Sequence, residues 1–398
     1  MKCAKDRVSV IIPTYNYACF LPYAIESVLS QNYQDIEVLV VDDGSTDETP
    51  QILSQFKSRI KYIHQENAGL SAARNKGIAH STGEFIQFLD ADDILGPSSI
   101  HSQIKFLKKY SNISISVCRN KLFKSIGSTG IPEPTGEWPL FRESLSVHLC
   151  FLNIAPPHAF LSRREAIVKT GWFDTGLKAC EDYEFWLRAA TKGFAPSYNP
   201  DGIVYYRRHP TSMSAKVSQQ VYYDSIVNKR LSTFFDRFPY FPENDRLEAL
   251  IAFCAGSVYT AGKLKNYYPD LVNQVMKSAR KHITEARELA FSQPCDWNIL
   301  IKLNYTRIVS FLAHPFFQNH RIALGILENL NQILSAVKAP NRKLLLINNL
   351  TLSAVSDPKI CIVEKNALKG LFFRYIKNYL LRLVWRCRLN KFVKMLTN

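Results

Sequence analysis

Three clusters of acidic residues lie at or near the ends of hydrophobic runs in the first half of the chain. They are Asp42-Asp43, Asp90-Ala91-Asp92-Asp93 and Glu181-Asp182. Carboxylates gathered at one end of a sheet repel one another unless a cation joins them, and Mg²⁺ or Mn²⁺ bridging protein oxygens to a diphosphate would do so. Each cluster alone is more simply explained by turn formers or helix caps. The order and spacing of the three together favour the metal and phosphate interpretation.

The elements that would position these clusters follow from hydrophobic periodicity. Predicted strands cover 8–12, 36–41, 60–63 and 85–89, and predicted helices cover 21–29, 70–79 and 98–110, with a further helix opened by a capping box at Ser45-Thr46-Asp47-Glu48. Strand and helix alternate in the βαβ rhythm of a doubly wound, mostly parallel sheet flanked by helices. Ligands of such sheets bind at the carboxyl ends of the strands.

The rest of the chain divides near residue 214. Ile113, Ile115 and Val117 predict another strand, residues 125–137 a Gly/Pro-rich surface loop, residues 182–190 a helix and residues 202–207 a strand. Beyond residue 214 the pattern is mainly helical. Residues 1–210 carry 23 of the 50 basic and 22 of the 34 acidic side chains, so residues 211–398 hold 27 against 12. We therefore expect an α/β domain over 1–214 and a helical basic region over 215–398.

Composition excludes several classes of protein. The chain has 398 residues, of which 46% are hydrophobic and 21% charged, so it is neither disordered nor a small disulfide-stapled module. Its nine cysteines are odd in number and nowhere in CxxC spacing, which favours a reducing cytoplasm. The amino terminus lacks a signal-peptide pattern and no apolar stretch reaches 18 residues. We expect a cytoplasmic protein, soluble or peripheral on the inner face of the membrane.

Six blocks together resemble the family 2 glycosyltransferases, which are inverting nucleotide-sugar enzymes of the GT-A fold. The blocks are VSVIIPTYN (8–16), SVLSQNYQDIEVLVVDDGSTDET (27–49), NAGLSAARNKGI (67–78), GEFIQFLDADD (83–93), GWFD with CEDYEFWLRA (171–174 and 180–189) and YRRHPTSMS (206–214). Their order is that of the family. The resemblance covers roughly residues 7–214 and says nothing about 215–398.

The resemblance implies a nucleotide-sugar site at the ends of the first two strands. Pro13, Thr14 and Tyr15 resemble the turn that packs against the nucleobase and ribose. Asp43, with Asp42 beside it, matches the family's contact to the base edge. Thr14 and Tyr15 could otherwise be ordinary turn residues.

The resemblance also implies a diphosphate and metal side. Arg74 falls in the family's diphosphate-side helix, where it would neutralise phosphate charge; a solvated surface arginine is the alternative. Asp90 resembles the ribose-side carboxylate, and Asp92 the ligand of Mg²⁺ or Mn²⁺. His209, after the last sheet strand, could approach the diphosphate or the metal, or be an ordinary surface histidine. Arg207 is a further phosphate candidate.

The catalytic base implied by the resemblance is Asp182. An inverting transfer needs one carboxylate to take the proton of the acceptor hydroxyl while its oxygen attacks the anomeric carbon. Otherwise Glu181 and Asp182 would merely begin a helix, where carboxylates favour the dipole. Trp172, Phe173 and Trp186 either stack on a sugar or belong to the core.

The last segment, 365–398, is rich in basic and aromatic side chains. Nine basic residues follow Glu364 without an acidic neighbour. This composition suits the surface of an anionic membrane, although a packed helix with a solvated basic face is the alternative. No recognition motif favours nucleic acid, so none is expected as a partner.

We therefore expect a metal-dependent inverting glycosyltransferase that uses a nucleotide-sugar, with a UDP-sugar as the expected donor. The expected acceptor is a glycan or a lipid-linked saccharide. Two alternatives stay open: transfer of a sugar to polyprenyl phosphate, and a non-catalytic binding protein that keeps the nucleotide fold. A degenerate binding protein should have lost Asp92 or Asp182, and both are present.

Overall fold

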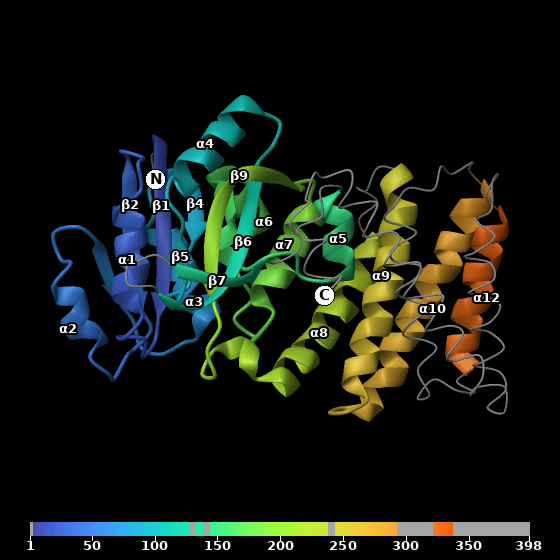
Figure 1. Ribbon diagram of the computed structural model, residues 1–398. Helices are drawn as coiled ribbons and strands as arrows, with labels where there is room; N and C mark the ends of the chain where they lie inside the picture. Colours follow the sequence, from blue (N-terminus) through green and yellow to red (C-terminus); the bar gives the residue numbers. More distant parts are fainter. Residues whose placement is uncertain (1–2, 127–131, 138–143, 238–242, 293–320, 337–398) are drawn as a thin grey trace, which may run out of the picture. The chain divides into compact units, whose positions relative to one another are not determined.

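The computed structural model describes residues 3–126, 132–137, 144–237, 243–292 and 321–336. The strands are β1 (Ala4–Thr14), β2 (Ile36–Asp42), β3 (Lys61–His64), β4 (Gly83–Phe88), β5 (Ile94–Leu95), β6 (Ile115–Ile126), β7 (Pro132–Glu137), β8 (Phe160–Arg163) and β9 (Pro196–Arg207). The helices are α1 (Leu21–Leu29), α2 (Thr49–Ser54), α3 (Leu70–His80), α4 (Ser99–Lys109), α5 (Leu145–Phe151), α6 (Arg164–Thr170), α7 (Glu181–Thr191), α8 (Val217–Arg237), α9 (Glu243–Leu264), α10 (Pro269–Ser292) and α12 (Arg321–Ala336), with short 3₁₀ turns η1 (Pro157–Ala159) and η2 (Met213–Ala215) (Figure 1).

These strands form one sheet in the order β3-β2-β1-β4-β8-β6-β9-β5, with β7 paired to β6. β1, β2, β3 and β4 are mutually parallel where they pair, and β6 is parallel to β9. β8 runs antiparallel to both β4 and β6, and β5 antiparallel to β9. The predicted α/β class with flanking helices is confirmed, and the sheet is parallel over its first four strands and mixed beyond them.

The sequence of β1 explains why it is an inner strand of the sheet, between β2 and β4. Val8, Val10, Ile11 and Ile12 are all fully buried, as expected for a β-branched run covered on both faces. α3 packs very close to this strand, since a Cβ on Gly77 would lie 2.3 Å from Ile11 Cγ2. Glycine is the residue that lets the helix approach the strand to this distance.

Two local predictions were wrong. The predicted capping box does not form: α2 begins at Thr49 with no side-chain cap, and Asp47 instead accepts hydrogen bonds from the main-chain N–H groups of Ala18 and Thr49. The Asp47 side chain thus joins the loop after β1, at Ala18, to the start of α2, at Thr49. The predicted surface loop 125–137 is partly a strand, because β7 pairs antiparallel with β6, Phe123 opposite Pro134. Residues 127–131 lie outside the described residues.

The described chain divides into two compact units. The first comprises the described residues up to Ala252 together with Lys263–Pro269, and therefore holds the sheet, α1 to α8 and part of α9. The predicted limit of the catalytic domain near residue 214 stays a prediction. α8, which follows that limit, belongs to the compact unit that contains the sheet.

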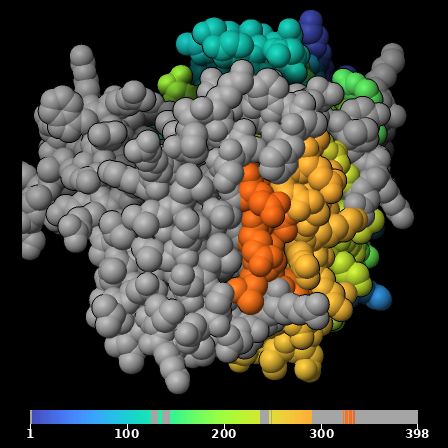
Figure 2. All heavy atoms as spheres, turned by 90° about the vertical axis from the view of Figure 1, so that its right-hand side faces the viewer, coloured from blue at the N-terminus to red at the C-terminus, as the bar shows by residue number. Residues whose placement is uncertain are grey.

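The described residues of the second unit are helical, as expected. This unit contains Phe253–Gly262 of α9 and the described residues from Asp270 on. α10 and α12 lie side by side (Figure 2), where Arg287 donates to Gln332 at 3.2 Å. The ring of Phe253 meets that of His282 edge to face at 4.8 Å. Among the described residues no helix is both long and apolar enough to cross a membrane. The basic segment 365–398 lies outside the described residues.

Candidate active site

The carboxyl ends of β1, β2 and β4 meet at one edge of the sheet. Thr14, the last residue of β1, is the register partner of Asp42, the last residue of β2. The main-chain N–H of Asp43 donates to the carbonyl oxygen of Thr14 at 2.9 Å, and that of Leu89 to Ile11. The predicted motifs that end in β1, β2 and β4 are therefore neighbours at this edge, where ligands of parallel sheets bind.

The two aspartates that end β2 are buried and hold protein donors. Asp42 accepts a hydrogen bond from the main-chain N–H of Ser45 at 2.9 Å and from the hydroxyl of Tyr62 at 3.1 Å. Its Oδ2 also lies 3.6 Å from Nδ1 of His64. Asp42 therefore shapes the loop after β2, and a contact to a nucleotide stays a prediction.

Asp43 organises the start of α3. Its carboxylate accepts hydrogen bonds from Gln65 Nε2 at 2.6 Å and from the main-chain N–H groups of Ala68 and Gly69 at 2.9 and 2.8 Å. Gly69 has a φ of 93°, a conformation that glycine adopts without strain. A carboxylate bonded to three donors is fixed in position. The predicted contact to the base edge is not tested by this geometry.

The turn after β1 presents one exposed aromatic ring. Pro13 and Thr14 are buried, and Thr14 Oγ1 has no hydrogen-bond partner among the described residues. Tyr15 is 45% exposed. Asn16, which sequence reasoning did not single out, has a φ of 56° and accepts from the main-chain N–H of Thr46 at 2.7 Å. Asparagine tolerates this left-handed conformation better than most residues, which is the signal that could have found it.

Arg74 joins two of the predicted acidic clusters. Its Nη2 donates to Asp90 Oδ1 at 2.7 Å, and its Nη1 donates to Glu181 Oε1 at 2.6 Å. The side chain is 1% exposed, and its guanidinium lies 5.3 Å from the ring centroid of Phe173. Burial lowers the pKa of Arg74, but the charges of Asp90 and Glu181 outweigh it and raise the pKa overall. The surface-arginine alternative is thus wrong, and the phosphate contact stays a prediction.

Asp92 and His209 come from distant parts of the chain and meet. His209 Nε2 lies 2.8 Å from Asp92 Oδ2, and His209 Nδ1 lies 2.8 Å from Thr211 Oγ1. The His209 ring packs against Phe20, with centroids 4.8 Å apart. The two side chains are 14% and 11% exposed, so they lie at the surface of the site.

Asp93 is the buried member of its cluster. Its Oδ2 lies 3.1 Å from Nδ1 of His158, and its Oδ1 accepts from the main-chain N–H of Arg207 at 2.7 Å. Burial raises the pKa of Asp93 to about 7. The Arg207 guanidinium lies 4.4 Å from the Phe123 ring and donates to the carbonyl oxygen of Asp92. Arg207 therefore holds the acidic turn in place and is 6% exposed.

The side chains at this edge fit a divalent cation. Asp92 offers a carboxylate oxygen and His209 an imidazole nitrogen, which are ligands of first-row divalent ions, and the two atoms already lie together. Asp90, two residues before Asp92 in the sequence, is 23% exposed. Asp90, Asp93 and His158 also place ligand atoms within 4.8 Å of one another, but Asp93 and His158 are fully buried and pair with each other.

Asp182 lies at the first turn of α7. Its Oδ2 accepts from Asn153 Nδ2 at 3.0 Å, and its Oδ1 accepts from the main-chain N–H of Tyr183 at 2.7 Å. Burial and then the neighbouring charge of Glu181 raise the pKa of Asp182 to about 7, against the opposing effect of Arg74. A carboxyl with such a pKa can exchange a proton near neutral pH, as a general base must.

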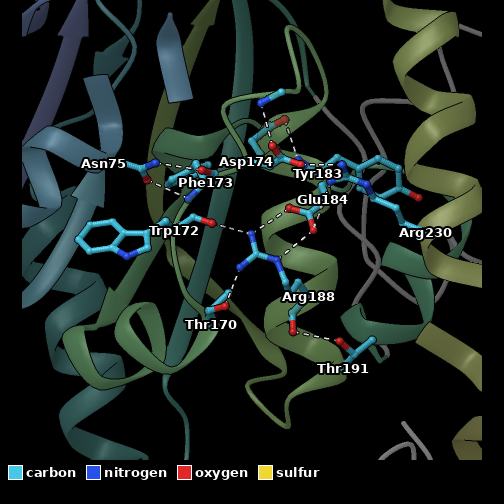
Figure 3. Close-up of polar contacts among 12 residues, drawn as sticks. Asn75, Thr170, Trp172, Phe173, Asp174, Tyr183, Glu184, Arg188, Thr191 and Arg230 are labelled. Carbon is cyan, nitrogen blue, oxygen red and sulfur yellow. Dashed lines mark hydrogen bonds and ion pairs between the residues drawn. The ribbon is translucent and has the colours of Figure 1, made fainter. Parts of the chain in front are cut away.

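The segment before α7 is fixed by Arg188 (Figure 3). Arg188 pairs with Glu184 one turn away and donates to the carbonyl oxygens of Thr170 and Trp172 at 2.6 and 2.9 Å. The side-chain amide of Asn75 accepts from the N–H of Phe173 and donates to its carbonyl oxygen. The GWFD block thus bonds to α3 and α7.

Two of the three candidate sugar-stacking aromatics belong to the core. Phe173 stacks on Phe185 at 4.2 Å and Trp186 stacks on Phe160 at 4.1 Å, and both are nearly fully buried. Trp172 is 58% exposed (Figure 3). The core alternative is therefore confirmed for Phe173 and Trp186.

Comparison with known proteins finds a family match for the part of the chain that contains the first two acidic clusters. Residues 9–170 match the family model described as Glycosyl transferase family 2. The resemblance to this family that the sequence motifs indicate is therefore confirmed over these residues. An uncharacterized glycosyltransferase of Rickettsia prowazekii is 35% identical over 185 residues, covering 46% of this chain and 58% of the relative's length. One from Haemophilus influenzae is 27% identical over 281 residues, covering 68% of this chain and 83% of that relative.

A solved structure supports the fold of this chain. The crystal structure of S. aureus TarS 1-349 in complex with UDP-GlcNAc has a TM-score of 0.50 and 16% identity, and the match covers 92% of both chains. At that identity the likeness concerns the fold alone. The GT-A-like fold expected from the sequence is confirmed. The match to the R. prowazekii relative covers little more than half of that protein.

Proposed function

We propose that this protein is an inverting glycosyltransferase that moves a sugar from a nucleotide-sugar to a hydroxyl group of a saccharide acceptor. The observation that carries the proposal is the buried bridge of Arg74 between Asp90 and Glu181. It places the Glu181-Asp182 element beside the acidic turn after β4. The family 2 match over residues 9–170 supports the same reaction class.

In the proposed reaction Asp182 acts as the base. Its carboxylate takes the proton of the acceptor hydroxyl while the hydroxyl oxygen forms a bond to the anomeric carbon. The bond from that carbon to the diphosphate breaks, and its electron pair leaves with the nucleoside diphosphate. One displacement from the opposite face inverts the configuration, and no covalent intermediate with the protein forms.

The role of Asp182 is supported by its hydrogen bonds. Both carboxylate oxygens accept one hydrogen bond, from Asn153 and from the N–H of Tyr183, so the group is held in a fixed direction. Asn153 Oδ1 is buried without a partner among the described residues. The hydrogen bond from Asn153 Nδ2 therefore orients the Asp182 carboxylate, which is how a preorganised base is supported.

The nucleotide of the donor would lie along the ends of β1 and β2. The exposed ring of Tyr15 and the Thr14 hydroxyl, which has no hydrogen-bond partner among the described residues, are available there for a base or ribose. A UDP-sugar is the proposed donor, in keeping with the UDP-GlcNAc bound by TarS. Asp43, already bonded to three protein donors, would act by fixing the start of α3.

Asp92 and His209 are the residues that would hold Mg²⁺ or Mn²⁺, with Asp90 beside them. When bound, such an ion supplies positive charge that stabilises the leaving diphosphate. His209 Nε2 lies 2.8 Å from Asp92 Oδ2, so the two side chains that would hold the ion already lie together. The proposed acceptor is a glycan or a lipid-linked saccharide, presented at the inner face of the membrane by way of the basic segment 365–398.

The test is incubation with a panel of UDP-, GDP- and dTDP-sugars and Mn²⁺, following release of the nucleoside diphosphate. One responding donor, with release abolished in Asp182→Asn, is the expected result. Release from no donor, or equal release by the Asp182→Asn variant, would remove support for the proposed reaction. Chemical analysis of a polyprenyl phosphate supplied as acceptor distinguishes the alternative enzyme class.

A further inference from the structure

Cys180, the residue before the Glu181-Asp182 element, has an unusual backbone conformation. Its φ of 59° and ψ of 19° place it in the left-handed region. Residues other than glycine, asparagine and aspartate rarely adopt this conformation, because Cβ crowds the backbone. Such a residue persists where its surroundings fix it, and these sites cluster at functional positions.

The side chain of Cys180 is held by α8. Its Sγ lies 3.2 Å from Asp224 Oδ1 and 3.3 Å from Gln220 Oε1. A side-chain amide oxygen can only accept a hydrogen bond, so the thiol is the donor toward α8. Burial and then the charge of Asp224 raise the pKa of the Cys180 thiol, which keeps its proton on the sulfur.

Two further contacts join the same segment to α8. Gln219 Nε2 donates to the carbonyl oxygen of Lys178 at 3.3 Å. Arg230 Nη2 lies 2.6 Å from Asp174 Oδ2, and Arg230 also approaches Glu184 of α7 at 4.0 Å (Figure 3). The loop that leads into α7 is therefore bonded to α8 at several positions between Gln219 and Arg230.

The buried position of Asp224 is unfavourable for a charged carboxylate. Burial raises its pKa, against the opposing charge of Lys263 and the hydrogen bond with Cys180, so the fold does not favour a carboxylate at this position. Asp224 Oδ1 nevertheless lies 3.2 Å from Sγ of Cys180, the residue immediately before Glu181-Asp182. The contact thus joins two unfavourable features, the buried carboxyl of Asp224 and the left-handed backbone of Cys180. Cys180 is two residues before Asp182.

We propose that Asp224 and Cys180 are positioning residues for Asp182: the contact between them fixes the backbone at the start of α7 and thereby the direction of the Asp182 carboxylate. This role rests on the proposed function, because it presupposes that Asp182 is the base. It extends the site into α8, which like Asp182 lies beyond the residues 9–170 that match the family model.

The experiment compares variants that keep or remove the contact. Cys180→Ser keeps a donor and Asp224→Asn keeps an acceptor, whereas Cys180→Ala and Asp224→Leu remove them. Cys180→Gly also removes the donor but adopts the left-handed conformation without strain, which separates the hydrogen bond from backbone strain. Cys254→Ala, which removes a buried cysteine of α9, is the matched control. The measurements are kcat and KM for nucleoside diphosphate release from the responding donor, with calorimetric UDP binding as the check on folding.

We expect Cys180→Ala, Cys180→Gly and Asp224→Leu to lower kcat by roughly 10- to 100-fold, the effect of a small misplacement of a reacting group. KM for the donor should stay nearly unchanged, and the two conservative variants should restore kcat. Asp182→Asn is measured in parallel. If it slows release while the three disruptive variants do not, or if they raise KM alone, the positioning role is wrong and the proposed function stands. If Asp182→Asn has no effect, the proposed function fails and this role with it.

Discussion

Arg74 Nη1 lies 2.6 Å from Glu181 Oε1, although the two residues are 107 positions apart in the chain. Because the same guanidinium also bonds Asp90, the donor side and the base side of the site share one buried cation. Removing it would leave two carboxylates facing each other without compensation.

Arg74→Met should destabilise the fold strongly. Breaking a buried ion pair by removing one partner costs about 3–5 kcal/mol, because the remaining charge is left uncompensated. Arg59→Met is the matched control, since Arg59 forms an exposed pair with Glu26 and exposed pairs contribute about 0–1 kcal/mol. Urea-induced unfolding measures both. Equal midpoints for the two variants would show that the Arg74 bridge does not stabilise the protein.

Asp182→Asn should separate binding from chemistry. The variant keeps the shape of the side chain but cannot take a proton, so turnover should fall by on the order of 10²–10⁴, the usual contribution of a positioned base. Calorimetric binding of the donor should be nearly unchanged. Asp201→Asn, a change at an exposed residue of β9, is a suitable control. Turnover of Asp182→Asn close to wild type would mean that the proton leaves by another route.

The rate should depend on pH through the titration of Asp182. Since its pKa is raised to about 7, the carboxylate needed as base is depleted below neutral pH, and kcat should fall as pH is lowered through about 7. A pH profile of kcat at saturating donor measures this. A profile that stays flat from pH 5 to 8 would contradict the assignment, because an unperturbed carboxyl titrates near 4.

The same titration affects stability. A carboxyl whose pKa is higher in the folded than in the unfolded state binds more protons when folded, so stability is lost as pH rises through the folded value. Asp182→Asn removes this loss. Its thermal midpoint should therefore exceed that of wild type at pH 8, with a smaller difference at pH 5. A lower midpoint at pH 8 would show that the hydrogen bonds of Asp182 outweigh its burial.

Donor binding should need a divalent ion through Asp92 and His209. Calorimetry with the responding nucleotide is performed with Mn²⁺ and with EDTA, for wild type, Asp92→Ala and His209→Ala. We expect EDTA to weaken binding to wild type, and each variant to lose most of the metal dependence, because each removes one ligand. Asp35→Ala, from an exposed pair with Arg7, serves as the control. Undiminished affinity in EDTA would contradict the metal role.

The segment 365–398 should attach the protein to anionic membranes. Each basic residue near such a surface contributes about 1 kcal/mol, and this attraction is screened by salt. The measurement is sedimentation with liposomes of varied anionic lipid content, comparing the full chain with a truncation before Lys365. Sedimentation that is equal for the two proteins, or independent of lipid charge, would favour the packed-helix alternative.

Much of the site could be predicted because its motifs are local. The β-branched run at Val8–Ile12 and the acidic residues after β2 and β4 follow one another within a βαβ pattern, and such a pattern fixes which strand ends meet. The helix predicted over 70–79 is observed over Leu70–His80. These features depend on spacing of a few residues, which a sequence displays directly.

Contacts between distant segments could not be predicted in this way. The burial of Arg74 depends on Glu181 arriving from another element, and that of Cys180 depends on α8. Asp47 offers a capping pattern, but the N–H of Ala18 competes for its carboxylate. A Gly/Pro-rich composition predicts a loop at 125–137, yet β7 forms there because β8 pairs with β6 only over Ile115–Val117, and β7 pairs with β6 farther along, from Lys121 to Ile126. In each case a tertiary partner overrides the local preference.

The order of strands in the sheet also bears on how the protein behaves at high concentration. The outermost strands are β3, with four residues beginning at Lys61, and β5, with two. β7, which extends the sheet beside β6, carries Pro132 and Pro134, which have no N–H to donate to another chain. Short, charged or proline-bearing margins are poor templates for intermolecular strand pairing. We therefore expect the described sheet to resist the edge-to-edge association through which β-proteins aggregate.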